Sequence, residues 1–361
     1  MKKVKVELGK NSFEIYIGSS LLPQVGNWLK AKGFSGKTVI ITDSNVRPLY
    51  AGNLESGLAA ADFKTTILEI PAGEEQKTLA NAGQLYQWLT EAYAERSTII
   101  LALGGGVIGD LAGFVAATYM RGVPLVQVPT SLLAMVDSSI GGKTAVDHGS
   151  LKNMVGSFYQ PKLVVADVET LTTLPKVELS NGMGEVIKHA VTFDKAFFDY
   201  LCKNISTAMA GDINILEKIV EKNARIKGPI VETDERESNR RTLLNYGHTV
   251  GHAVEAVSDF KIKHGQAVAI GMMAAAKISV RLGTFNEDGL KQLETLLLEA
   301  GLPVKLPDMN RDQQGKLMEL IKHDKKVLDG KIRLVLLKAI GSAYITNKVG
   351  TDLIVEVLFG R

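Results

Sequence analysis

The first half of the chain alternates short runs of β-forming residues with helical patterns, and this alternation constrains the fold most. Five such runs, bounded by polar residues or glycine, cover residues 38–42, 65–70, 98–103, 125–128 and 163–166. Strands separated by helices predict a largely parallel sheet that helices cover. Before them, residues 2–7 and 13–18 alternate around Gly9-Lys10-Asn11, which predicts an opening hairpin.

After Pro175 the pattern becomes mostly helical, with long amphipathic or apolar stretches at residues 265–282 and 289–300. A chain of 361 residues is long enough for two domains with substantial cores. We therefore predict an α/β domain over residues 1–178 and a mostly helical domain over residues 179–361. Apolar runs at 334–337 and 353–358 are candidates for minor strands.

Composition excludes several classes of protein. Hydrophobic residues make up 45% and charged residues 22% of the chain, as in an ordinary globular protein. Cys202 is the only cysteine, which excludes a disulfide framework and a thiolate zinc cluster and indicates a reducing cytoplasm. The N-terminus reads as a strand and not as a signal peptide, and no apolar run is long enough for a membrane span. The net charge of +3 carries no basic stripe, so we expect a small anionic ligand and not nucleic acid.

A polar stripe is predicted in the second domain. Arg241, Asn245, His248 and His252 are spaced four, three and four residues apart, so a single helix would place them on one face. Their neighbours are largely apolar or small, which favours a lined functional cavity over a solvated face. His248 and His252 can share a metal or divide ligation and acid–base chemistry between them. Thr249 stands where a metalloprotease of the HExxH type has its glutamate, which argues against a protease.

A glycine-rich turn follows the third β-forming run. Gly104-Gly105-Gly106-Val107-Ile108-Gly109-Asp110 joins that run to a helical pattern, which predicts phosphate binding at a helix N-terminus. Other predicted strand ends carry Asp43 and Asn45, Glu74 and Lys77, and Thr130 and Ser131, which together would line one crevice.

A second glycine-rich stretch carries lysines. Gly141-Gly142-Lys143 and then Lys152-Asn153 suit another anionic group. The stretch is not a Walker A motif, GxxxxGK[ST]. Gly142-Lys143-Thr144 would match its end, but Asp137 stands where its first glycine is required.

Several long motifs resemble the 3-dehydroquinate synthase family of the sugar phosphate cyclase superfamily. They include GGGVIGDLAGFVAATYMRG, VPTSLLAMVDSSIGGKTAVDH, LKNMVGSFYQP, GEVIKHAV and RTLLNYGHTVGHAVEA followed by KHGQAVAIGM, in consistent order between residues 43 and 337. The resemblance implies a Rossmann-like NAD-binding domain, a helical domain, an active site in the cleft and a homodimer. The chain departs from the common pattern GGKTGVNHPLGKN with GGKTAVDHGSLKN, which leaves Lys143, Lys152 and Asn153 in place.

The resemblance also implies residue roles. Glu185, His248 and His264 would coordinate a divalent metal, Zn²⁺ or Co²⁺. Substrate would contact Asp137, Lys143, Lys152, Asn153, Lys188, Lys227, Arg241, Asn245, His252 and either Lys325 or Lys326, and Arg121 would reach the partner subunit's phosphate site. NAD would contact Asp43, Asn45, Glu74, Glu75, Gln76, Lys77, Gly105, Gly106, Val107, Ile108, Gly109, Asp110, Thr130, Ser131, Lys143, Lys152, Thr170, Leu171, Thr172 and Thr173.

The family reaction converts 3-deoxy-D-arabino-heptulosonate 7-phosphate to 3-dehydroquinate and phosphate. Three alternatives stay open at this point. A sister cyclase for another sugar phosphate would keep the metal and NAD residues but not Arg241 and Asn245. A metal-dependent alcohol or glycerol dehydrogenase would share the architecture without needing so many lysines. A non-enzymatic NAD-sensing module would need no metal ligands.

Overall fold

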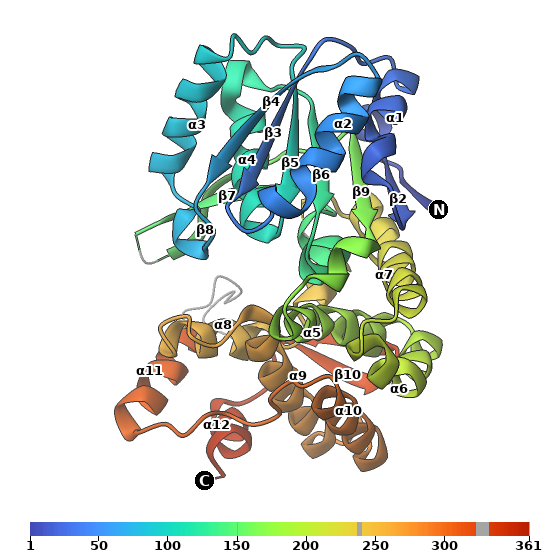
Figure 1. Ribbon diagram of the computed structural model, residues 1–361. Helices are drawn as coiled ribbons and strands as arrows, with labels where there is room; N and C mark the ends of the chain where they lie inside the picture. Colours follow the sequence, from blue (N-terminus) through green and yellow to red (C-terminus); the bar gives the residue numbers. More distant parts are fainter. Residues whose placement is uncertain (150, 237–239, 323–331, 361) are drawn as a thin grey trace. The chain divides into compact units, whose positions relative to one another are not determined.

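The computed structural model describes residues 1–149, 151–236, 240–322 and 332–360. The chain divides into two compact units (Figure 1). The first unit comprises Met1–Leu174 and Leu216–Glu232, and the second comprises Pro175–Ile215 and Thr233–Arg361. No helix in the described part of the chain combines the length and the apolar character that crossing a membrane requires.

A seven-stranded sheet forms the centre of the first unit. In spatial order its strands are β1 (Lys2–Val6), β2 (Phe13–Gly18), β9 (Leu163–Asp167), β6 (Leu125–Pro129), β5 (Ile99–Gly104), β3 (Lys37–Asp43) and β4 (Lys64–Ile70). Only β1 runs antiparallel, as the predicted hairpin with β2, and the other described pairings of this sheet are parallel. The predicted fold class, a mostly parallel α/β sheet, is confirmed.

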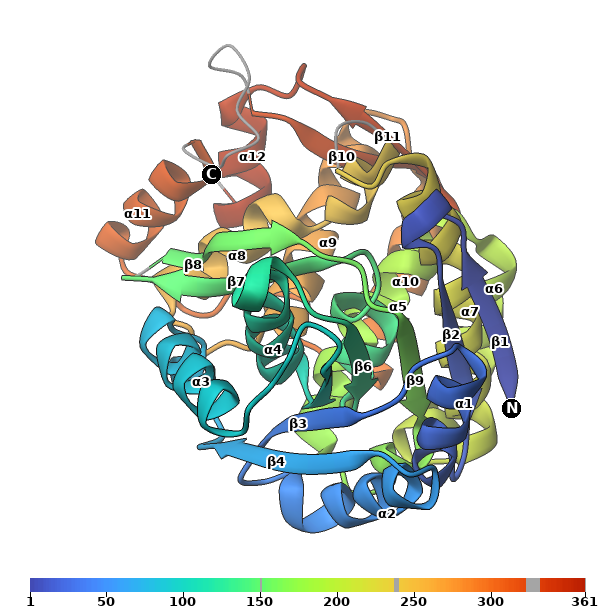
Figure 2. The ribbon, with the colours of Figure 1, turned by 90° about the horizontal axis from the view of Figure 1, so that it is seen from above.

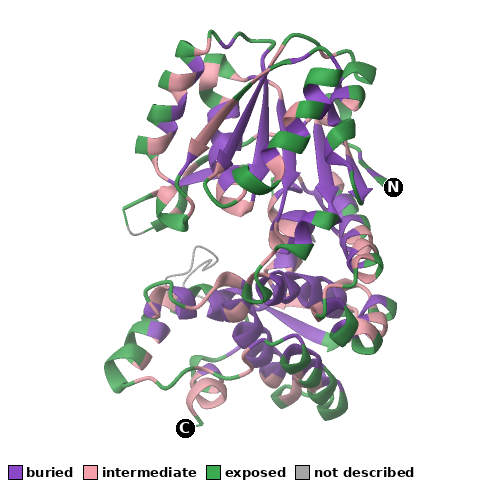
Figure 3. Ribbon diagram, viewed as in Figure 1, coloured by how far each residue is buried: buried purple, intermediate pink, exposed green. Residues whose placement is uncertain are grey.

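Helices cover both faces of this sheet, as the view from above shows (Figure 2). On one face α1 (Val25–Ala31) and α2 (Gly52–Ala60) pack on Ile40 and Leu101. On the other face α3 (Leu79–Glu91) and α4 (Gly106–Thr118) pack on the neighbouring Ile41 and Ile100. Because consecutive strand residues point to opposite faces, strands buried on both sides are nearly continuous apolar runs. Figure 3 shows this buried centre.

Two further elements complete the first unit. The hairpin of β7 (Lys143–His148) and β8 (Leu151–Phe158) is antiparallel. Helix α7 (Ile213–Thr233) brings residues 216–232 back to the first unit, where the Glu7 amide donates to Glu232 Oε1 at 2.7 Å. The prediction of a single boundary near residue 178 did not include this return of the chain to the first unit. An amphipathic pattern reveals that a helix packs, but not on which unit.

The second unit is mostly helical, as predicted. Its helices are α5 (Lys176–Phe193), α6 (Lys195–Met209), α8 (His248–Val257), α9 (His264–Arg281), α10 (Glu287–Glu299), α11 (Arg311–Lys322) and α12 (Thr351–Phe359). The strand predicted near 334–337 is confirmed as β10 (Leu334–Ala339), which pairs with β11 (Ser342–Thr346). The strand suggested at 353–358 is wrong, because these residues form α12, whose Val357, Leu358 and Phe359 pack on the α8–α9 core.

The single helix predicted to carry the polar stripe is also wrong. Arg241 and Asn245 belong to a 3₁₀ helix, η8 (Arg240–Asn245), and α8 begins only at His248. Gly247 separates the two with a left-handed φ of +80°. A Cβ there would lie 2.7 Å from the Val268 carbonyl oxygen, so both conformation and packing require glycine. The stripe is therefore two segments that meet at a sharp turn.

Candidate active site

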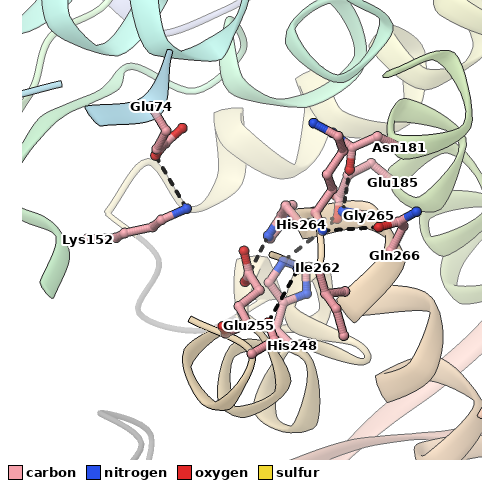
Figure 4. Close-up of polar contacts among 12 residues, drawn as sticks. Glu74, Lys152, Asn181, Glu185, His248, Glu255, Ile262, His264, Gly265 and Gln266 are labelled. Atoms are coloured by element: carbon pink, nitrogen blue, oxygen red, sulfur yellow. Dashed lines mark hydrogen bonds and ion pairs between the residues drawn. The ribbon is translucent and has the colours of Figure 1, made fainter. Parts of the chain in front are cut away.

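The three predicted metal ligands come together in the second unit (Figure 4). Glu185 lies in the middle of α5, while His248 and His264 are the first residues of α8 and α9. Glu185 Oε1 lies 3.7 Å from His248 Nε2 and 3.6 Å from His264 Nε2. Metal bonds of about 2.0–2.2 Å in tetrahedral geometry separate neighbouring ligand atoms by roughly 3.3–3.6 Å. These distances suit three ligands around one divalent ion.

The other ring nitrogen of each histidine faces an acceptor. His248 Nδ1 lies 3.3 Å from the Tyr246 carbonyl oxygen, and His264 Nδ1 lies 3.3 Å from Glu255 Oε2. A proton on each Nδ1 therefore satisfies both acceptors and leaves the Nε2 lone pairs toward Glu185. The donor set fits a metal ion in tautomer as well as in distance.

The charges around His264 favour a cation. Burial lowers the pKa of His264, but the carboxylates of Glu185 and Glu255 outweigh it and raise that pKa to about 10. Glu185 is fully buried and also pairs with Lys188, one helical turn later. Without a metal the imidazole thus carries a proton, and a divalent ion would supply the positive charge in its place.

Glycines let the ligand-bearing helices approach closely. A Cβ on Gly184 would lie 2.6 Å from the Gly265 carbonyl oxygen, and a Cβ on Gly265 would overlap the Asn181 carbonyl. The Gly265 amide donates to Asn181 Oδ1 at 2.6 Å, which ties the start of α9 to α5. Gly184, Gly247 and Gly265 each adjoin a metal ligand in the sequence. The backbone positions of the three ligands are therefore fixed by helix packing.

Further predicted residues of the second unit are His252, Arg241 and Asn245. His252 is exposed, and its ring centroid is 5.1 Å from that of His248 and 6.1 Å from that of His264. Arg241 is buried, with Nη1 donating to the Glu235 carbonyl at 2.6 Å, and Asn245 is partly exposed at the end of η8. Lys325 and Lys326 lie outside the described residues.

In the first unit, the predicted NAD residues follow the carboxyl ends of parallel strands. Asp43 ends β3, η4 (Glu74–Gln76) follows β4, Thr130 and Ser131 follow β6, and η7 (Val168–Thr172) follows β9. The strand order reverses between β3 and β5, because β4 lies on one side of β3 and β5 on the other. Ligands of open α/β sheets bind at such a reversal, outside the carboxyl ends.

The glycine-rich turn after β5 leaves space above the N-terminus of α4. Neither Gly105 nor Gly106 has a positive φ. Cβ atoms there would come no nearer than 3.5 Å to Ser131 Oγ and 3.4 Å to Ser138 Oγ. Gly104 differs, since a Cβ on it would lie 2.7 Å from Ile108. Folding alone thus does not require glycine at 105 and 106, whereas the close approach of a phosphate to the helix amides would.

Lys77 is the buried centre of a polar cluster in the first unit. Its Nζ donates to Asn153 Oδ1 at 2.9 Å and lies 3.1 Å from Glu74, 3.4 Å from Asp110 and 3.8 Å from Asp147. Burial raises the pKa of Asp110 to about 6, although Lys77 opposes the shift. Glu74 also lies 3.5 Å from Lys152 Nζ (Figure 4). Predicted NAD residues and predicted phosphate residues therefore contact one another directly.

Asp147 is a member of this cluster that the sequence did not indicate. Its Oδ1 accepts from the Asn153 amide at 2.8 Å, and Asn153 has a left-handed φ of +56°. An acid in a strand, distant in sequence from Lys77, gives no local signal of this role.

The last predicted substrate residues of the first unit are Asp137, Lys227, Lys143 and Arg121. Lys227 of α7 pairs with Asp137 and donates to its carbonyl oxygen at 2.7 Å. Lys143 is exposed at the start of β7. Arg121 is exposed at the end of η5 (Tyr119–Arg121), with a left-handed φ of +69°.

Comparison with known proteins gives the class first. The structure is similar to a 2-deoxy-scyllo-inosose synthase complexed with carbaglucose-6-phosphate, NAD⁺ and Co²⁺, at a TM-score of 0.90 and 28% identity over 99% of both chains. It is also similar to the 2-epi-5-epi-valiolone synthase of Streptomyces hygroscopicus with NAD⁺ and Zn²⁺ bound, at a TM-score of 0.87 and 27% identity over 98% of both chains. The architecture is that of the sugar phosphate cyclases.

The sequence then gives the family. The model of the 3-dehydroquinate synthase N-terminal region matches residues 67–181, and that of the C-terminal region matches residues 182–327. The 3-dehydroquinate synthase of Desulforamulus reducens is 45% identical over 359 residues, which cover 99% of both proteins. The chain belongs to the 3-dehydroquinate synthase family and is an enzyme of this type.

Proposed function

We propose that this chain converts 3-deoxy-D-arabino-heptulosonate 7-phosphate to 3-dehydroquinate and phosphate. The observation that carries the proposal is the group of Glu185, His248 and His264, spaced for one divalent ion in a chain of this family. The reaction passes through transient oxidation at C5, β-elimination of phosphate, reduction, ring opening and intramolecular aldol closure.

The proposal includes NAD and one Zn²⁺ or Co²⁺ ion as cofactors. Similar cyclases hold NAD⁺ with one or the other metal, and the ligand distances and the open α4 N-terminus of this chain fit both groups. When bound, NAD supplies a reversible hydride acceptor and the metal a Lewis acid. Glu74, Lys77, Asp110 and the Gly105-Gly106 turn would hold the dinucleotide.

The substrate is a small anion with two charged ends, and the chain offers cations for both. The planar fork of Arg241 suits the carboxylate. Lys152 and Asn153 suit the phosphate, and Asn153 is already held by Lys77 and Asp147. His252, which is exposed beside two metal ligands, would move protons at neutral pH. Lys188, Lys227, Asp137 and Asn245 would orient the substrate through hydrogen bonds, and the departing phosphate would accept the C6 proton.

We further propose a cytoplasmic homodimer in which Arg121 reaches the phosphate site of the partner subunit. Arg121 and Met120 both project from a left-handed turn, and Met154 and Phe158 are exposed on β8. Covering such exposed apolar side chains with another chain would be favourable.

The test follows phosphate release and nicotinamide absorbance together, with zinc and a large excess of substrate over NAD. We expect many phosphates for each NAD and no accumulation of NADH, because the hydride returns within each turnover. His264→Ala should lose turnover by roughly three orders of magnitude, as expected for loss of a Lewis acid worth several kcal/mol. One NADH released for each substrate consumed would instead identify a dehydrogenase.

A further inference from the structure

Glu255 lies behind the metal ligands and has no part in the proposed chemistry. Its side chain is 7% exposed, and its Oε2 lies 3.3 Å from Nδ1 of His264 (Figure 4). Burying a carboxylate is costly unless a donor or a cation compensates it. The imidazole of His264 is such a partner, so the contact is a strong candidate for a functional role.

The turn between α8 and α9 brings Glu255 and His264 together. Glu255 is seven residues after His248, and therefore lies on the same face of α8. The chain then turns back through Asp259 and Phe260, both with left-handed φ angles of +51° and +58°, before α9 begins at His264. The Phe260 amide donates to the Glu255 carbonyl oxygen at 2.9 Å, which closes this turn. The turn places the ring of His264 between two carboxylates.

His252, Glu255 and His264 form a second group whose possible ligand atoms lie within 4.8 Å of one another. In that arrangement Glu255 would itself bind the metal. The orientation of the His264 ring favours an indirect role. His264 directs Nε2 toward Glu185 and Nδ1 toward Glu255, and one ring cannot direct both nitrogens at one ion. Glu185 and Glu255 therefore lie on opposite sides of the ring.

We infer that Glu255 is a positioning residue that fixes the ring and tautomer of His264 and thereby strengthens metal binding. This inference rests on the proposed function only in assuming that a divalent metal binds the three ligands. As an acceptor for Nδ1–H, the carboxylate orients the ring and makes Nε2 a better donor to the ion. Its charge, added to that of Glu185, balances a divalent cation.

The test measures metal binding directly, by titrating Zn²⁺ into the metal-free full chain against a chromophoric chelator. Carboxylate partners of this kind change metal affinity by about 10–100-fold. We expect Glu255→Gln, which keeps an acceptor but removes the charge, to weaken binding about 10-fold, and Glu255→Ala to weaken it up to about 100-fold. The control is Asp259→Asn, which removes the same charge from the exposed end of the same turn and should leave affinity unchanged.

The cobalt-loaded proteins separate the indirect role from direct ligation. At saturating Co²⁺ we expect the variants to keep the wild-type visible spectrum, because the ligand set is intact. A spectrum that reports one ligand fewer in Glu255→Gln would overturn the inference and make Glu255 a ligand. Wild-type affinity in both Glu255 variants would also overturn it. Neither result touches the proposed function, which fails separately if the wild-type chain binds no metal.

Discussion

At the scale of single residues, the first unit contains an acidic side chain whose ionised form is destabilised by its surroundings in the fold. Asp110 is partly buried beside Lys77, with a pKa raised to about 6 from an ordinary value of 3.8. A carboxyl whose folded pKa is raised holds its proton longer in the folded than in the unfolded state. It therefore destabilises the fold progressively as pH rises from about 4 to about 6. Retention of such an acid is typical of a residue kept for binding.

Replacing this acid with a neutral amide should reveal that effect. We expect Asp110→Asn to match the wild type at pH 4 and to be more stable by about 1–3 kcal/mol at pH 7, with weaker NAD binding. Denaturant unfolding of the NAD-free protein at several pH values measures the difference. Asp62→Asn is the control, because Lys30 lowers the pKa of Asp62 and its loss should not stabilise the fold at pH 7. A gain that does not change with pH would contradict the prediction.

The sequence pointed to single site residues only where a motif carried them. Glu185, His248 and His264 came from the family resemblance, and the structure places their ligand atoms within 4.8 Å of one another. Asp147 was missed, because its partners Lys77 and Asn153 belong to another turn and to the far strand of its hairpin. Glu255 was missed too, although its spacing from His248 and His252 on α8 is a signal that could have found it.

At the scale of elements, the metal ligands depend on how closely α5 and α9 cross. At positions 184 and 265 the two helices lie too close together for any residue larger than glycine. The helical pattern at residues 265–282 predicted α9, but it could not predict this contact, since a glycine within a helix does not by itself indicate a close neighbour. The polar stripe failed at the same scale, because the left-handed Gly247 breaks the continuous helix that the spacing of Arg241, Asn245, His248 and His252 assumed.

Adding one methyl group at the crossing should disturb both folding and metal binding. We expect Gly265→Ala to destabilise the protein by about 1–3 kcal/mol through overpacking. Metal affinity should fall as well, because His264 moves with α9. Gly315→Ala is the matched control in the exposed part of α11, where a Cβ meets no atom within 4 Å, and should be neutral or stabilising by up to about 1 kcal/mol. Urea unfolding and zinc titration test both, and equal behaviour of the two variants would rule the packing argument out.

The turn before α4 allows the opposite separation, with binding lost and folding kept. A Cβ at Gly105 has space within the protein, and its φ of −75° is ordinary for alanine. We expect Gly105→Ala to change stability by no more than about 0.5 kcal/mol. We also expect the Kd for NAD to rise at least about 10-fold, because the methyl group occupies the place of a phosphate. Gly83→Ala in α3 is the control, and calorimetric titration of NAD that shows equal affinity in all three proteins would contradict the prediction.

At the scale of the whole molecule, a shared site would make two inactive chains active together. If Arg121 serves the partner subunit, Arg121→Ala lacks the phosphate contact and His264→Ala lacks the metal. In a mixed dimer one site would combine an intact metal centre with an intact Arg121. Random pairing makes about half of the dimers mixed, each with one competent site, so we expect about a quarter of wild-type activity. Activity no higher than that of the separate variants after subunit exchange would exclude this role for Arg121.

The return of residues 216–232 to the first unit has a consequence for synthesis on the ribosome. When all seven strands of the sheet have left the ribosome, α7 has not yet been synthesised. Asp137 therefore has no Lys227 to pair with until that helix emerges. Residues 175–215, which belong to the second unit, are made before the first unit can be completed. Domains usually fold one after another as they leave the ribosome. In this protein part of the second unit is therefore synthesised before the first unit is complete, and the folding of the two units must overlap in time.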